Sequence, residues 1–233
     1  MTYLNDVHGI IIGGNQNLIR DECTYDENDN LIQLAEPAIS KTRNLSSGII
    51  RAHGAHKIAS FLREHGADIE VLDYSFSWNL EELKDFWKSR YHSKTLFLSL
   101  STTFRISSLY IWQFAEWIRE NYPHIHSLGG TQSIDKMLPY RLDWYIYGYG
   151  EYGMLELIKS LRDNTSDSLK YHQVGNKKLI NCQKHYRSFP KKELSISYED
   201  RDFIESWEVL PMELARGCIF ECAFCSFPIL GIR

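Results

Sequence analysis

The chain has 233 residues, of which 43% are hydrophobic and 24% are charged, a composition typical of globular proteins and unlike that of disordered or collagen-like chains. Its formal net charge of −4 argues against a broad nucleic-acid-binding surface. Because it shows neither 18 consecutive apolar residues nor a signal peptide, we expect a cytoplasmic protein with reduced thiols and no membrane partner.

Short β-branched runs alternate with amphipathic stretches through the first two thirds of the chain. This alternation predicts five strands, at 8–14, 68–74, 95–101, 124–130 and 143–147. Helices are expected at 48–66, 79–91, 106–122 and 151–162, with a short helical piece around 134–138. We therefore expect an α/β fold with a doubly wound, five-stranded parallel sheet that is Rossmann-like in character.

Two segments interrupt this pattern. Residues 15–47 are a polar insertion with an expected hairpin around 26–30. Residues 166–206 contain two short strand-like runs and a charged stretch, which indicate a small hairpin and a linker. We divide the chain into a sheet domain (1–165), this linker (166–206) and a C-terminal segment (207–233).

The loops after four of the predicted strands are rich in glycine and hydroxylic residues: 13–14, 99–103, 129–130 and 148–151. In a parallel sheet such loops meet at the carboxyl edge, where α/β proteins bind their ligands. Small residues there let a ligand approach the backbone, so we predict a ligand site at this edge. The alternative is that tight strand-to-helix turns simply need glycine.

Residues 148–153 read Gly-Tyr-Gly-Glu-Tyr-Gly, the GxGxxG pattern of dinucleotide-binding turns. Such a turn belongs to a unit whose next strand ends in a ribose-binding acid. The motif follows the last predicted strand of the sheet, and Glu151 would oppose a pyrophosphate. We therefore interpret it as a turn in which Glu151 accepts hydrogen bonds from a ligand or caps the following helix.

Three of the five cysteines form a CxxxCxxC motif near the end of the chain: Cys218, Cys222 and Cys225. Three thiolates in one loop can hold three irons of a cubane cluster and leave the fourth iron open. A structural zinc site needs a fourth protein ligand, and the nearest candidates, Cys182 and His185, lie more than 30 residues upstream. Zinc binding and three cysteines without a ligand are the alternatives.

The cysteine motif resembles that of the radical S-adenosylmethionine (SAM) superfamily, with an aromatic residue, Phe224, before its third cysteine. The preceding LPMELARGC resembles the first barrel strand of that family. The resemblance implies that Cys218, Cys222 and Cys225 bind a [4Fe–4S] cluster and that SAM chelates its open iron. Phe224 would lie near the adenine. One electron, from a donor such as flavodoxin or ferredoxin, would then cleave SAM to methionine and a 5′-deoxyadenosyl radical.

The sheet domain resembles the cobalamin-binding domain of cobalamin-dependent radical SAM proteins, through LSLSTTF (98–104), SLGG (127–130) and YGYGE (147–151). The residues expected around the corrin and its nucleotide tail are Ser99, Ser101, Thr102, Gly129, Gly130, Gly148, Gly150 and Glu151. Many such domains carry DxHxxG, whose histidine ligates cobalt. Here Asp6 and His8 begin that pattern before the strand, with Ile11 in place of its glycine, so we expect cobalamin without a histidine axial ligand.

The expected function is that of a radical SAM enzyme acting on a small molecule, with cobalamin as second cofactor, by methyl transfer or another radical rearrangement. The alternatives are a non-catalytic module that binds cobalamin or a partner, and a zinc protein. Only eight residues follow Cys225, whereas a partial barrel needs roughly 150–200 more. We therefore expect a fragment, a chain completed by a second polypeptide, or an inactive remnant.

Two other patterns are interpreted as structural. His53 and His56 lie three residues apart on a predicted helix and are expected at its surface. Residues 26–37 imitate the start of a calcium-binding loop, but Leu31 and Pro37 stand where such a loop requires glycine and glutamate.

Overall fold

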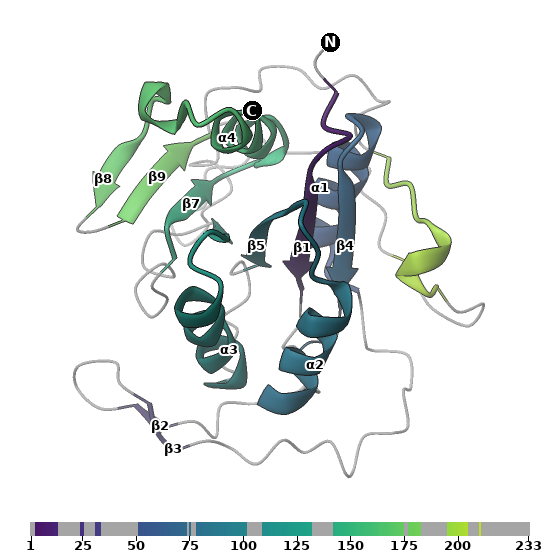
Figure 1. Cartoon of the computed structure of the whole chain (residues 1–233), viewed down its shortest axis with the longest axis vertical. Helices are drawn as coiled ribbons and strands as arrows, with labels where there is room; N and C mark the ends of the chain where they lie inside the picture. The colour runs from purple at the N-terminus through teal and green to yellow at the C-terminus, as the bar shows by residue number, and fades with distance from the viewer. Residues whose placement is uncertain are drawn as a thin grey trace, which may run out of the picture.

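The computed structural model describes residues 3–13, 24–25, 31–33, 51–73, 75, 78–101, 109–131, 142–174, 177–182, 195–204 and 210. Its centre is a seven-stranded sheet in the order β4-β1-β5-β6-β7-β9-β8 (Figure 1). The strands are β1 (His8–Ile12), β4 (Asp68–Leu72), β5 (Thr95–Ser101), β6 (His126–Thr131), β7 (Trp144–Tyr147), β8 (His172–Val174) and β9 (Lys177–Asn181). All neighbours pair in parallel except β8, which is antiparallel to β9.

Helices cover both faces of this sheet. They are α1 (His53–Glu64), α2 (Leu80–Arg90), α3 (Leu109–Asn121) and α4 (Glu151–Arg162). The core on one face contains side chains of α1 and α4, and the core on the other face contains those of α2 and α3, which lie side by side (Figure 1). Strand β1 serves both cores, because Ile11 faces α1 and α4 while Ile10 and Ile12 face α2 and α3.

The expected α/β fold is confirmed, and the predicted parallel sheet is mostly parallel, with β8 as its antiparallel strand. Each predicted strand is present, with ends that differ by up to two residues. The predicted start of α2 is also confirmed, since the Asn79 side chain accepts a hydrogen bond from the Glu82 backbone N–H at 3.0 Å and Glu82 returns one at 2.8 Å. Helix α1 begins at His53, five residues later than expected.

The sheet has seven strands, not the five predicted. The two strand-like runs between 171 and 182 form the expected hairpin, and this hairpin joins the main sheet through the pairing of β9 with β7. Leu179 and Ile180 of β9 are 3% and 6% exposed, one in each core. A two-stranded hairpin cannot bury such side chains alone, so burial against β7 explains the extension.

Two smaller features complete the described structure. Strands β2 (Thr24–Tyr25) and β3 (Leu31–Gln33) form an antiparallel pair, in agreement with the hairpin predicted around 26–30. A short 3₁₀ helix, η4 (Ser166–Ser168), follows α4, and another, η6 (Asp200–Asp202), contacts β4. Within the described residues, no helix is long and apolar enough to cross a membrane. The predicted helical piece at 134–138 lies outside the described residues.

Candidate functional site

The predicted ligand-binding residues gather at the carboxyl edge of three neighbouring strands. Ser99 and Ser101 lie on β5, Gly129 and Gly130 lie on β6, and Gly148, Gly150 and Glu151 follow β7. The remaining predicted site residues lie outside the described part of the chain: Thr102, Cys218, Cys222, Phe224 and Cys225.

Ser101 and Gly130 are neighbours across two strands, because the parallel register places them directly opposite each other. Side chains alternate along a strand, so Ser101 points to the same face as Phe97, and Gly130 to the same face as Leu128. Both Phe97 and Leu128 belong to the core beneath α1 and α4. Ser101 and Gly130 therefore face the side of the sheet on which α1 and α4 lie.

The two glycines of β6 have different roles. A side chain at Gly129 would collide with Leu142 and Tyr145, so this glycine permits close packing inside the protein. Among the described residues, a Cβ at Gly130 would meet nothing within 4 Å. Gly130 thus leaves open space beside the end of its strand, as a site for a large ligand requires, whereas Gly129 is a packing residue.

The two serines of β5 also differ. The Ser99 side chain is buried, with a residue exposure of 7%, and lies inside the sheet rather than at its rim. Ser101, two residues nearer the carboxyl end, is half-buried and keeps its hydroxyl within reach of the edge. Only Ser101 of this pair is placed to contact a ligand at the edge.

The turn after β7 is shaped by two glycines. Gly148 has a φ of +93°, a backbone conformation that favours glycine, and Gly150 is the N-cap of α4. A Cβ at Gly150 would lie 3.1 Å from Ile146 and 3.5 Å from Ile58, so the turn packs tightly against α1. Glu151 is the first residue of α4 and is 3% exposed. An acidic residue in the first turn is favoured by the positive end of the helix, and the predicted capping hydrogen bond of Glu151 stays a prediction.

The structure corrects one reason given above against dinucleotide binding. A further parallel strand, β9, does follow α4, so the GxGxxG turn is part of a β7–α4–β9 unit. However, β9 ends at Asn181 and not at an acid, and the third glycine, Gly153, is required because a side chain there would collide with Cys182. With Glu151 buried at the helix start, the turn remains better suited to packing than to a pyrophosphate.

A buried histidine–aspartate pair lies beside the carboxyl edge, at the start of α1. The predicted surface position of His56 is wrong, since this residue is 1% exposed and its Nε2 lies 2.9 Å from Oδ2 of Asp73. Both carboxylate oxygens of Asp73 accept from the Ala52 backbone N–H at 3.1 Å and so cap the helix. Asp73 directly follows β4, so the pair joins a strand end to a helix start, which the helix pattern alone does not reveal.

The sequence was compared with known proteins. No protein-family model matches the chain, and no curated protein matches it.

Proposed function

We propose that this chain carries the cluster-binding and cobalamin-binding parts of a radical SAM enzyme of the cytoplasm, with an electron donor such as flavodoxin or ferredoxin. The observation that carries the proposal is the CxxxCxxC motif of Cys218, Cys222 and Cys225. When bound, the cluster supplies the electron that cleaves SAM, and cobalamin carries the methyl group in a transfer to a small-molecule substrate.

The carboxyl edge of the sheet supports cobalamin as the second cofactor. Ser101 and Gly130 lie opposite each other on one face, and a Cβ added at Gly130 would meet no described residue within 4 Å. A corrin or its nucleotide tail needs such close access to the backbone. His56 is buried beside this edge, at 1% exposure, so its ring is not accessible to the cobalt of a cofactor bound at the edge. The edge therefore fits cobalamin bound through its periphery.

The chain's own residues would have simple tasks in this proposal. The Ser101 hydroxyl offers a hydrogen bond to the bound group, and the Gly130 backbone allows contact at van der Waals distance. Gly148 and Gly150 set the direction in which the chain enters α4. The apolar cores under α1 and α4 hold this edge rigid, as a positioning site requires.

Cluster binding is tested by anaerobic reconstitution with iron and sulfide, followed by the absorption spectrum and by iron, sulfide and zinc analysis. We expect a cluster in the wild type and none in Cys222→Ala. Cys182→Ala is the matched control and is expected to keep the cluster, since Cys182 is buried at the end of β9. An unchanged spectrum in Cys222→Ala, or zinc with no iron in the anaerobic protein, contradicts the proposal.

Cobalamin binding is tested separately by gel filtration with hydroxocobalamin and measurement of the absorbance retained by the protein. The wild type is expected to retain about one equivalent. Gly130→Val fills the space beside β6 and is expected to lose that retention. Its thermal unfolding is expected to stay close to that of the wild type, because a Cβ at this position would meet no described residue within 4 Å. Equal retention by both proteins contradicts the assignment of this edge.

A further inference from the structure

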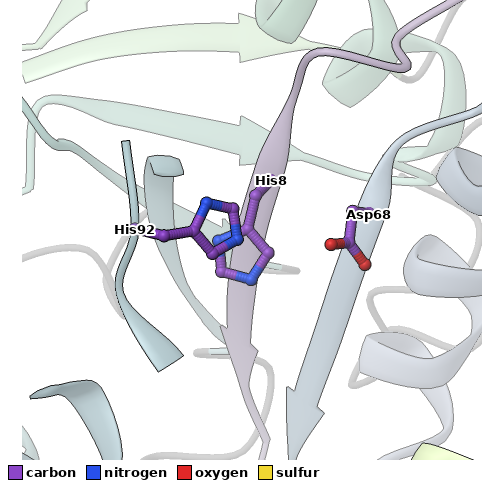
Figure 2. Close-up of side chains that lie close together, drawn as sticks. All are labelled: His8, Asp68 and His92. Atoms are coloured by element: carbon purple, nitrogen blue, oxygen red, sulfur yellow. The ribbon is translucent and has the colours of Figure 1, made fainter. Parts of the chain in front are cut away.

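Three potential metal ligands lie together at the amino edge of the sheet, opposite the carboxyl edge. His8 begins β1, Asp68 begins β4, and His92 lies in the turn before β5. One ligand atom from each lies within 4.8 Å of the other two. Figure 2 shows the two imidazole rings one over the other and the Asp68 carboxylate directed toward them from the neighbouring strand.

Main-chain pairing fixes these residues relative to one another. His8 lies opposite Asp68 in the register of β1 and β4, and opposite Thr95 in that of β1 and β5. The Asp68 backbone N–H donates to Val7 at 2.8 Å, and the His8 backbone N–H donates to Lys94 at 2.9 Å. The group therefore lies on three adjacent strand starts, which provide the rigid support that a metal site needs.

Of the two ring nitrogens of His8, Nδ1 has a hydrogen-bond partner among the described residues and Nε2 has none. The residue is 0% exposed, and its Nδ1 lies 2.8 Å from Oγ1 of Thr95. Its Nε2 has no hydrogen-bond partner among the described residues, and the nearest carboxylate oxygen, from Glu70, is 3.5 Å away. An unsatisfied buried nitrogen is costly. When Nδ1–H donates to a threonine oxygen, Nε2 carries the lone pair that a metal accepts, an arrangement common in metal-binding histidines.

His92 lies on the solvent-exposed side of the group. Its ring centroid lies 4.2 Å from that of His8, and its residue is exposed to solvent. The His92 backbone N–H donates to Oγ1 of Thr95 at 3.0 Å, so the same hydroxyl that orients His8 also holds the turn that carries His92. The buried ring anchors the site, and the exposed ring can move to meet an incoming ion.

Asp68 supplies the negative charge of the group, and Arg201 competes with an incoming ion for its carboxylate. The Asp68 side chain is 52% exposed and forms an ion pair with Arg201 of η6. A metal ion would therefore replace Arg201 as the partner of the Asp68 carboxylate.

We propose that His8, His92 and Asp68 bind a divalent transition-metal ion of the zinc class. Two imidazoles and a carboxylate suit zinc, whereas calcium and magnesium prefer oxygen ligands alone. Tetrahedral zinc ligands lie about 3.3 Å apart for bonds of about 2.0–2.1 Å. The ligand atoms, now within 4.8 Å of one another, therefore have to approach by up to about 1.5 Å, which the exposed His92 and Asp68 side chains allow. The proposal is independent of the proposed function, because it involves neither the cysteine motif nor the carboxyl edge.

The test is isothermal titration calorimetry of the full chain with Zn²⁺. It is performed in a Cys218→Ala, Cys222→Ala, Cys225→Ala background, so that the cysteine motif does not bind the added zinc. We expect one site, and we expect His92→Ala and Asp68→Asn each to weaken the affinity by about tenfold or more. Both positions are exposed. Unchanged thermal unfolding without zinc would show that these variants are folded.

Two further variants complete the test. His124→Ala removes an exposed histidine outside the group and is expected to bind zinc like the parent protein. Arg201→Gln removes the competitor of Asp68 and is expected to bind zinc several-fold more tightly. The proposal is overturned if the parent protein binds no zinc, if His92→Ala binds as tightly as the parent, or if Arg201→Gln binds more weakly.

Discussion

The surroundings of Cys182 distinguish it from the cysteines of the CxxxCxxC motif. It follows β9, is 1% exposed and packs against Gly153 of α4. Burial, with the charges of Glu156 and Glu151, raises the pKa of its thiol to about 12. A protonated thiol is neither a metal ligand nor a nucleophile, so Cys182 is a core residue and is unsuited to be a fourth cluster ligand.

This property of Cys182 is measurable with Ellman's reagent at pH 8. The native wild type and native Cys182→Ala are expected to give the same thiol count, because Cys182 is protonated and inaccessible. In denaturing urea the wild type should show one thiol more than the variant. A lower native count for Cys182→Ala would contradict the burial of this side chain.

The segment 195–204 lies against α1 through contacts spread along the helix. Lys57 donates to the Ser195 carbonyl at 2.9 Å, and Ser60 Oγ accepts from the Ser197 backbone N–H at 2.9 Å. At the end of the segment, Arg63 and Asp202 form a bidentate ion pair with distances of 2.7 and 2.9 Å. These contacts attach the chain that leads toward the cysteine motif to the first helix of the sheet domain.

The pair of Arg63 and Asp202 is the strongest of these contacts, because the two side chains are only 7% and 0% exposed. Asp202→Ala would remove the nearer carboxylate from a buried guanidinium that keeps only Glu199, at 3.6 Å, as a charged partner among the described residues. It is expected to lower the free energy of unfolding by about 3 kcal/mol. Urea unfolding at pH 7 measures this change. Asp85→Ala, which breaks the exposed pair with Lys88, is the control and should cost less than about 1 kcal/mol.

The contribution of the Arg63–Asp202 pair to the stability of the fold is expected to depend on pH. Burial acts to raise the pKa of Asp202. The hydrogen bond from Arg63 and the positive charge of Arg63 outweigh burial, so the pKa of Asp202 lies below its usual value. A carboxyl group whose pKa is lower in the folded state stabilises the protein above its unfolded value of about 3.9, and this contribution is lost as the pH falls below it. The difference in stability between wild type and Asp202→Ala should therefore shrink from pH 7 to pH 3. A difference that stays constant would show that ionisation of Asp202 does not contribute.

Local patterns predicted the elements of this fold, and contacts between distant residues explain what they missed. The cap of α2 was predictable because Asn79 and Glu82 are neighbours in sequence. The burial of His56 depends on Asp73, 17 residues away, and the orientation of His8 depends on Thr95, 87 residues away. At the carboxyl edge the sequence indicated the glycines but not which of Gly129 and Gly130 is open, because Leu142 and Tyr145 decide that.

The whole sheet presents two different edges. Its carboxyl edge has small residues, open space at Gly130 and helix starts occupied by the carboxylates of Asp73 and Glu151. Its amino edge has two imidazoles and a carboxylate around the first residues of β4, β1 and β5. The five residues of β1 separate these edges by about 16 Å. One edge thus suits a large organic cofactor, and the other suits a small cation.

This separation predicts that the two edges bind independently. None of the proposed zinc ligands His8, Asp68 and His92 lies at the carboxyl edge, so His92→Ala should retain cobalamin like the wild type. For the same reason, Gly130→Val should bind zinc with an affinity within about twofold of the parent. The double variant should show the sum of the two single effects. Gel filtration with hydroxocobalamin and zinc calorimetry measure both properties on the same preparations. A change of fivefold or more in either affinity, caused by a mutation at the opposite edge, would contradict this prediction. Such a change corresponds to a coupling free energy of about 1 kcal/mol between the two edges. Parallel strands with a fixed register are not expected to transmit a coupling of that size.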